Sequence, residues 1–87
     1  DIKRVRDELN DEYFWFGALN KARQDAMIDI SFNLGQTRLR GFKNALAAME
    51  EENFDEAADE FMNSRWAEQV KSRAPEVTEM IRTGEYS

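Results

Sequence analysis

Two arginines and one aspartate are the residues of this sequence best suited to form a charged site. Arg65 and Arg73 each follow a serine in the stretch SRWAEQVKSRA, residues 64–74. A serine before a helical run is typical of a helix N-cap, where a free cation is unfavourable because the helix dipole is already positive. Asp29 lies in a mostly apolar segment, where an unpaired carboxylate would be costly. We therefore expect a polar seam in which Asp29 meets an arginine, and the residues alone leave open which one.

Carboxylates could also catalyse the hydrolysis of a glycosidic bond. This reaction needs two carboxylates about 5–9.5 Å apart. The chain has 18 acidic residues among 87, so some pair will meet this distance by chance. Asp29 lies within a mostly apolar helical segment, and a structural ion pair explains it more simply than catalysis does. The stretch EEENFDEAADE, residues 50–60, has seven acids and no base. It lacks the glycine-centred loop of an EF-hand, so we interpret it as an exposed helix face and expect no metal and no cofactor.

The composition excludes several classes of function. The chain contains no cysteine and no histidine, which rules out a disulfide framework, Cys or His zinc ligands and an imidazole acid–base catalyst. Its net charge of −6 argues against binding to nucleic acid or to an anionic membrane surface. No apolar run approaches the roughly 20 residues of a membrane-spanning helix. The first residue is Asp1 rather than Met, and we expect the chain to be a piece of a longer protein.

Helical periodicity runs through the whole sequence and predicts an all-α fold. The segment from about residue 20 to 34 is apolar on nearly every side and ends at Gly35, which is typical of a buried central helix. The segment QTRLR, residues 36–40, is expected to be a turn. We predict a single domain, residues 1–87, in which about six or seven short helices pack around the central one. The other helices are expected within residues 1–12, 41–53, 53–63, 64–71 and 72–84.

Four consecutive aromatic residues, Tyr13, Phe14, Trp15 and Phe16, follow the first helix. Such a cluster usually fills a small core, and we interpret it in this way. A platform on which a sugar stacks and an exposed docking patch are the alternatives.

A series of short segments resembles the C-terminal lobe of the phage-type lysozymes. The resemblance extends from Leu19 to the end of the sequence, roughly four-fifths of the chain. The matching segments occur in the family's order: FNLG (32–35), GFKNAL (41–46), FDEAA (54–58), SRW (64–66), Gln69, SRA (72–74) and RTG (82–84). The resemblance implies that residues 1–12 are the second half of the helix that joins two lobes. Residues 13–87 would then form the C-terminal lobe itself.

The resemblance implies hydrolysis of the β-1,4 bond between N-acetylmuramic acid and N-acetylglucosamine in bacterial peptidoglycan. The family's catalytic glutamate, and the aspartate and threonine that work with it, belong to an N-terminal lobe that this sequence lacks. No residue here is therefore assigned a catalytic role, and the chain alone is expected to be inactive. The expected partners are a peptidoglycan glycan strand and the missing lobe. The expected location is the host cytoplasm before release to the cell wall, or the virion tail.

Two further interpretations stay open. One is a non-catalytic binding or structural module derived from the same fold. The other is an unrelated helical interaction domain whose matching segments are a coincidence.

The resemblance also implies positions that face the substrate. Phe32 falls on a position that lines the sugar site, and Asn33 falls on a neighbouring amide position facing the cleft. Ala45 and Glu60 fall on further substrate contacts, where serine and asparagine are expected. A methyl group cannot make the hydrogen bond of a serine, and a carboxylate cannot donate one as an amide does.

Three charged residues are expected to support the site from across the cleft. The resemblance places Arg73 where an arginine pairs with the catalytic glutamate, and Arg65 where an arginine reaches acids of the other lobe. Asp29 takes the place of an expected asparagine beneath Arg73. We therefore expect Asp29 to be the local partner of Arg73.

Overall fold

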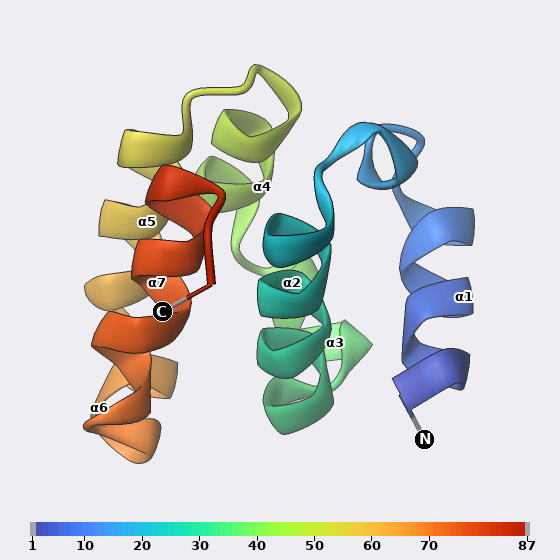
Figure 1. Ribbon diagram of the computed structural model, residues 1–87. Coiled ribbons are helices and arrows are strands. Elements are labelled where there is room, and N and C mark those ends of the chain that lie inside the picture. The colour runs from blue at the N-terminus through green and yellow to red at the C-terminus, as the bar shows by residue number, and fades with distance from the viewer. Residues whose placement is uncertain (1, 87) are drawn as a thin grey trace.

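The computed structural model describes residues 2–86, which form helices joined by short turns and, over that range, no strand (Figure 1). The predicted all-α fold is confirmed. The elements in chain order are α1 (Ile2–Glu12), the 3-10 helix η1 (Phe16–Ala18), α2 (Lys21–Leu34), α3 (Gln36–Arg40), α4 (Lys43–Glu50), α5 (Phe54–Met62), α6 (Arg65–Val70) and α7 (Arg73–Thr83). None of the helices within residues 2–86 is both long enough and apolar enough to cross a bilayer.

Helix α2 is the centre of the fold, as its apolar pattern predicted. It packs against α1, α3, α6 and α7, and Figure 1 shows it between α1 on one side and α5 and α7 on the other. The Asn20 side chain caps its start by accepting a hydrogen bond from the backbone N–H of Arg23, 2.9 Å away. Gly35 ends the helix at a φ of +82°, a backbone conformation that is unfavourable for residues with a Cβ.

One hydrophobic core joins all parts of the chain. Its largest fully buried side chains are Trp66, Phe16, Phe61, Leu9, Met27, Ile30, Leu39, Met49 and Ile81. Burying a side chain of this size stabilises a fold by about 1.5–3 kcal/mol. The core is therefore what holds the short helices, which would be marginal as isolated segments in water.

The segment QTRLR is helix α3 and not the predicted turn. Its backbone hydrogen bonds begin at Gly35, whose carbonyl accepts from the N–H of Leu39 at 3.1 Å. Leu39 is fully buried and anchors the helix. A five-residue segment with one apolar side chain has no periodicity to reveal it, because the burial of Leu39 depends on tertiary packing.

The two serines before α6 and α7 differ in what they do. The Ser64 side chain accepts a hydrogen bond from the backbone N–H of Ala67 at 3.4 Å, as predicted for an N-cap. Ser72 has helical backbone angles and makes no capping bond through its side chain. The prediction of two serine caps is therefore half right, because at Ser72 the backbone has already turned into helix.

The aromatic cluster divides between core and surface. Phe16 and Trp15 are buried in the core, and Tyr13 packs against it. Phe14 is 83% exposed. Most of the cluster fills the core, as interpreted from the sequence, but Phe14 does not.

Candidate functional site

The expected ion pair between Asp29 and Arg73 is present. The Arg73 guanidinium donates to one carboxylate oxygen of Asp29. The Asn33 side-chain amide donates to the other, at 3.0 Å, and also to the Asp29 backbone carbonyl at 2.9 Å. The Asp29 side chain is 21% exposed and that of Arg73 is 59% exposed. Both carboxylate oxygens thus have donors, so this cluster is a hydrogen-bonded ion pair at the edge of α2.

Arg65 does not join this cluster. Its side chain is exposed, and no carboxylate between residues 2 and 86 lies within the 4.0 Å of an ion pair. It lines a different hollow, beside Leu34 at the end of α2 and Trp66 of α6. The polar seam expected from the sequence therefore contains one of the two arginines.

Ala45 and Glu60 come together in one open hollow. This hollow has a volume of about 430 Å³ and lies where the start of α4 faces α5; its lining residues are Gly41, Phe42, Lys43, Asn44, Ala45 and Glu60. Ala45 is only 1% exposed, so its methyl group belongs to the floor. Glu60 is exposed. We name this space the Glu60 hollow.

Phe32 lies in a separate place. It is 58% exposed and borders a groove of about 350 Å³ between α1 and the end of α2, together with Val5 and Ser31. The amide of the neighbouring Asn33 is held by Asp29. The four predicted substrate positions therefore do not share one cavity, and their roles in binding stay predictions.

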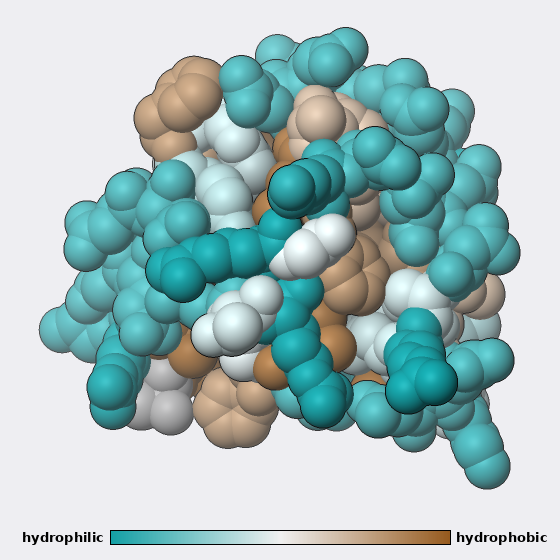
Figure 2. Space-filling view, turned by 180° about the vertical axis from the view of Figure 1, so that it is seen from behind, coloured by the Kyte–Doolittle hydropathy of each residue, from teal (hydrophilic) through white to brown (hydrophobic). Residues whose placement is uncertain are grey.

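Four residues of a further hollow were not singled out as site residues from the sequence. Arg38, Phe42, Trp66 and Gln69 line this hollow of about 340 Å³ with Leu34 and Arg65; we name it the Trp66 hollow. Phe42 also lines the Glu60 hollow, so the two are neighbours. Figure 2 shows the rear of the molecule, where apolar surface is visible between hydrophilic side chains. No single sequence signal identifies such a set, because its members come from α2, α3, α6 and the turn before α4.

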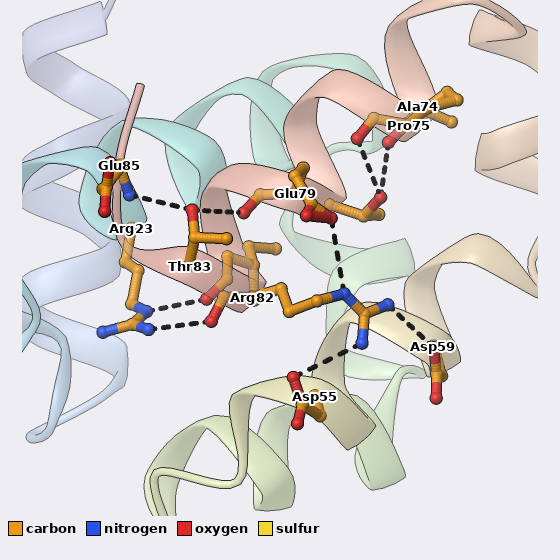
Figure 3. A network of polar contacts seen from close by, with 11 residues as sticks. Arg23, Asp55, Asp59, Ala74, Pro75, Glu79, Arg82, Thr83 and Glu85 are labelled. Atoms are coloured by element: carbon orange, nitrogen blue, oxygen red, sulfur yellow. Dashed lines mark hydrogen bonds and ion pairs between the residues drawn. The ribbon is translucent and has the colours of Figure 1, made fainter. Parts of the chain in front are cut away.

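The acidic stretch on α5 is balanced by an arginine. Arg82 of α7 lies 2.9 Å from Asp59, 3.4 Å from Asp55 and 3.4 Å from Glu79 (Figure 3). The hydrogen bond with Asp59 is the main cause that raises the pKa of Arg82. Among the described residues, no group of three or more acidic side chains is arranged to hold a metal ion. All seven acids of residues 50–60 are exposed, but only those of α5 form the helix face interpreted from the sequence, because Glu51 and Glu52 lie in the turn between α4 and α5.

Known proteins resemble this chain over most of its length. Over 66 residues, which are 76% of this chain, it is 36% identical to "Probable T4-type lysozyme 1" of Dictyostelium discoideum. Over 69 residues, which are 79% of this chain, it is 32% identical to "Probable T4-type lysozyme 2" of the same organism. The chain is related to the phage-type lysozymes. No protein-family model matches it.

This phage-type lysozyme relative also resembles a phage structural protein. It is 34% identical over 67 residues, 77% of the chain, to the "Pre-baseplate central spike protein Gp5" of Enterobacteria phage T4. The chain spans 39% and 41% of the two Dictyostelium proteins and 12% of the spike protein. The matches therefore establish the relationship for one part of each of these proteins.

Proposed function

We propose that this chain is the C-terminal, substrate-wall lobe of a phage-type muramidase that cleaves the N-acetylmuramic acid–N-acetylglucosamine bond of peptidoglycan. The observation that carries the proposal is the similarity to T4-type lysozymes over 76% and 79% of the chain, which spans only about two fifths of their length. In this proposal α1 is the second half of the helix that joins the lobes. The catalytic carboxylates belong to the other lobe, and this chain alone is inactive.

Arg65 and Arg73 are the residues of this lobe that would contact the N-terminal lobe. Arg73 contacts Asp29 on α2, and Arg65 shares a hollow with Leu34, the last residue of the same helix. Both cations thus lie near the C-terminal part of α2. We infer that Arg73 faces the catalytic glutamate across the cleft and that Arg65 faces acids of the other lobe.

Asp29 would modulate this contact. A cation beside a carboxyl group lowers its pKa, and the catalytic acid must stay protonated to donate to the leaving oxygen. Because Asp29 already neutralises Arg73, it would keep the pKa of the glutamate from falling too far. In a two-lobed protein, Asp29→Asn should therefore shift the alkaline limb of the pH–rate profile to lower pH.

The proposal is tested by clearing of a peptidoglycan suspension. The chain is assayed alone and as a fusion to the N-terminal lobe of a T4-type lysozyme, with a fusion carrying a Glu→Gln change of the catalytic acid as control. We expect clearing by the intact fusion only. Clearing by the chain alone would contradict the proposal, and Asp29 would then be the first residue to mutate.

A second candidate is a non-catalytic wall-binding or structural module of a phage particle. The burial of Ala45 and the position of Phe32 in a different groove from the Glu60 hollow favour it, as does the similarity to the spike protein. That similarity also favours the virion tail over the host cytoplasm as the location. A folded fusion that binds insoluble peptidoglycan but never clears it would support this candidate.

A further inference from the structure

A pocket at the start of α2 is separate from the polar seam and from the other hollows. It has a volume of about 240 Å³ and lies between η1, the start of α2, the end of α4 and the start of α5. These parts of α2, α4 and α5 meet at the end of the molecule opposite α6 (Figure 1). The pocket shares no lining residue with the Glu60 hollow, the Trp66 hollow or the groove beside Phe32. We name it the Trp15 pocket.

The inner wall of the Trp15 pocket is apolar. Trp15, Leu19 and Met49 line it and are 8%, 9% and 1% exposed. The ring of Tyr13 packs beside that of Trp15, with centroids 5.1 Å apart, so the indole has a fixed position. The volume is below the roughly 300–1,000 Å³ of pockets that hold drug-sized ligands. A ligand of this pocket must therefore be small and must have an apolar body.

The cation that lines the Trp15 pocket is already held by other parts of the chain. The Arg23 guanidinium donates to two backbone carbonyls in the last turn of α7 and lies over the ring of Phe54. The Asn20 side-chain amide donates to the carbonyl of Gly84. Both polar side chains on the α2 side of the pocket are thus fixed by the end of α7.

Two carboxylates line the opposite side without a partner. Glu50 is the last residue of α4, and Glu52 lies in the turn that follows. Both are exposed, and neither side chain forms an ion pair or hydrogen bond with any residue from 2 to 86. Glu52 has a φ of +62°, a conformation more usual for glycine or asparagine. The geometry of the turn therefore does not explain why a glutamate stands there.

The charges and the apolar wall together select the chemistry of a ligand. Two carboxylates against one arginine leave the lining with a net negative charge, which disfavours an anion. Ionised carboxylates only accept hydrogen bonds, so a ligand that satisfies them must donate. The ring of a tryptophan is also favourable for a nearby cation. An organic ammonium ion meets all these conditions, whereas a bare metal ion would leave the apolar wall unused.

We propose that the Trp15 pocket binds a small primary ammonium ion with an apolar body. The ammonium group donates to the carboxylates of Glu50 and Glu52, and the apolar body lies against Trp15 and Met49. The chain's net charge of −6 favours the approach of a cation. The proposal rests on the pocket alone and holds whether or not the chain is half of a muramidase.

The test is an NMR titration of the ¹⁵N-labelled chain with 2-phenylethylammonium chloride at constant ionic strength. The chain has two tryptophans, and Trp66, which lines another hollow, is the internal reference. We expect the indole N–H signal of Trp15 to move and to saturate with a roughly millimolar Kd, while that of Trp66 stays in place.

Two further probes separate the charge from the apolar body. 2-Phenylethanol keeps the ring without the charge, and ethylammonium keeps the charge without the ring. Each should bind about tenfold more weakly or less, because one lacks the charge-assisted hydrogen bonds and the other the burial of a ring. Equal binding of ethylammonium would show attraction of any cation by an acidic surface, and equal binding of 2-phenylethanol would show apolar contact only. Either result would overturn the proposal.

Variants of the acidic turn identify the groups responsible. Glu50→Gln and Glu52→Gln should each weaken binding about three- to tenfold, because each replaces an ionised acceptor by a neutral amide. Glu51→Gln is the matched control, since Glu51 lies between them in the sequence, is exposed and does not line the pocket. It should change the Kd by less than about twofold. Weakening by Glu51→Gln equal to that of its neighbours would contradict a defined site, and so would unchanged binding in all three variants.

Discussion

The guanidinium carbon of Arg23 lies 3.6 Å from the ring centroid of Phe54. The same side chain donates to the backbone carbonyls of Ile81, at 2.7 Å, and Arg82, at 3.1 Å (Figure 3). One residue of α2 thereby joins the start of α5 to the last turn of α7. A cation is favourable at that position, because the carbonyl end of a helix carries partial negative charge.

Replacing Arg23 should destabilise the fold substantially. Arg23→Met keeps much of the side-chain volume but loses the cation–π contact and leaves two carbonyls without their donors. We expect the free energy of unfolding in urea to fall by about 2–4 kcal/mol. Arg4→Met is the control, since Arg4 is exposed and lacks a partner in the described chain, and it should change the free energy by less than about 0.5 kcal/mol. Equal effects of the two changes would refute the structural role of Arg23.

Gly84 should not tolerate a side chain. Its φ is +75°, and a Cβ there would lie 2.7 Å from the Asn20 amide nitrogen and 2.9 Å from the Arg23 guanidinium carbon. It would therefore displace the hydrogen bond from Asn20 to the Gly84 carbonyl, now 2.8 Å long. Gly84→Ala is expected to cost about 2 kcal/mol in thermal or urea unfolding. Gly17→Ala is the matched control, because a Cβ at Gly17 meets only the Asn10 side chain, at 3.4 Å.

The Asp29–Arg73 pair should contribute little to stability. Because the Arg73 side chain is 59% exposed, water and salt screen the attraction. A double-mutant cycle with Asp29→Asn and Arg73→Gln is expected to give a coupling of about 1 kcal/mol or less, smaller still at high salt. A coupling several times larger would mean that the pair holds the lobe together. A small value would leave Arg73 free to exchange partners, as the proposed cross-cleft role requires.

Both tyrosines should ionise above their usual pKa of 10.0. Burial is the main cause that raises the pKa of Tyr13, and the hydrogen bond that Tyr86 donates to Asp25 is the main cause that raises the pKa of Tyr86. The folded chain thus keeps these protons to higher pH than the unfolded chain, so the free energy of unfolding should fall as the pH rises above about 10. Phenolate absorbance at 295 nm, titrated with and without denaturant, measures the difference. In Tyr86→Phe the remaining titration should report Tyr13 alone.

The central helix was predictable because its evidence is local. Apolar side chains on nearly every face of residues 20–34, with Asn20 before them and Gly35 after, describe a buried helix before any packing is known. Helix α3 lacked such evidence, since Leu39 is buried only by its neighbours. Ser64 has an extended backbone and caps α6, whereas Ser72 already has helical backbone angles and caps nothing; the letters SR before each helix do not distinguish the two cases.

The candidate sites were predictable only in part. The cost of an unpaired carboxylate on an apolar helix predicted that Asp29 would pair with an arginine, and the resemblance to the phage-type lysozymes indicated Arg73. The Trp66 hollow could not be derived in this way, because whether Arg38, Arg65 and the Trp66 N–H have partners depends on where side chains from four segments end up. Likewise, Ala45 and Glu60 meet because α4 packs against α5, and the separation of Phe32 from them is also a tertiary property.

The position of α7 has a consequence for how the chain is made. This helix packs against both α2 and α5, and its end is held by Asn20 and Arg23. During synthesis α2 (Lys21–Leu34) and α5 (Phe54–Met62) leave the ribosome before α7 (Arg73–Thr83). Until α7 follows, the faces of α2 and α5 that pack against it stay open to water, and such transiently exposed apolar surface is prone to aggregation.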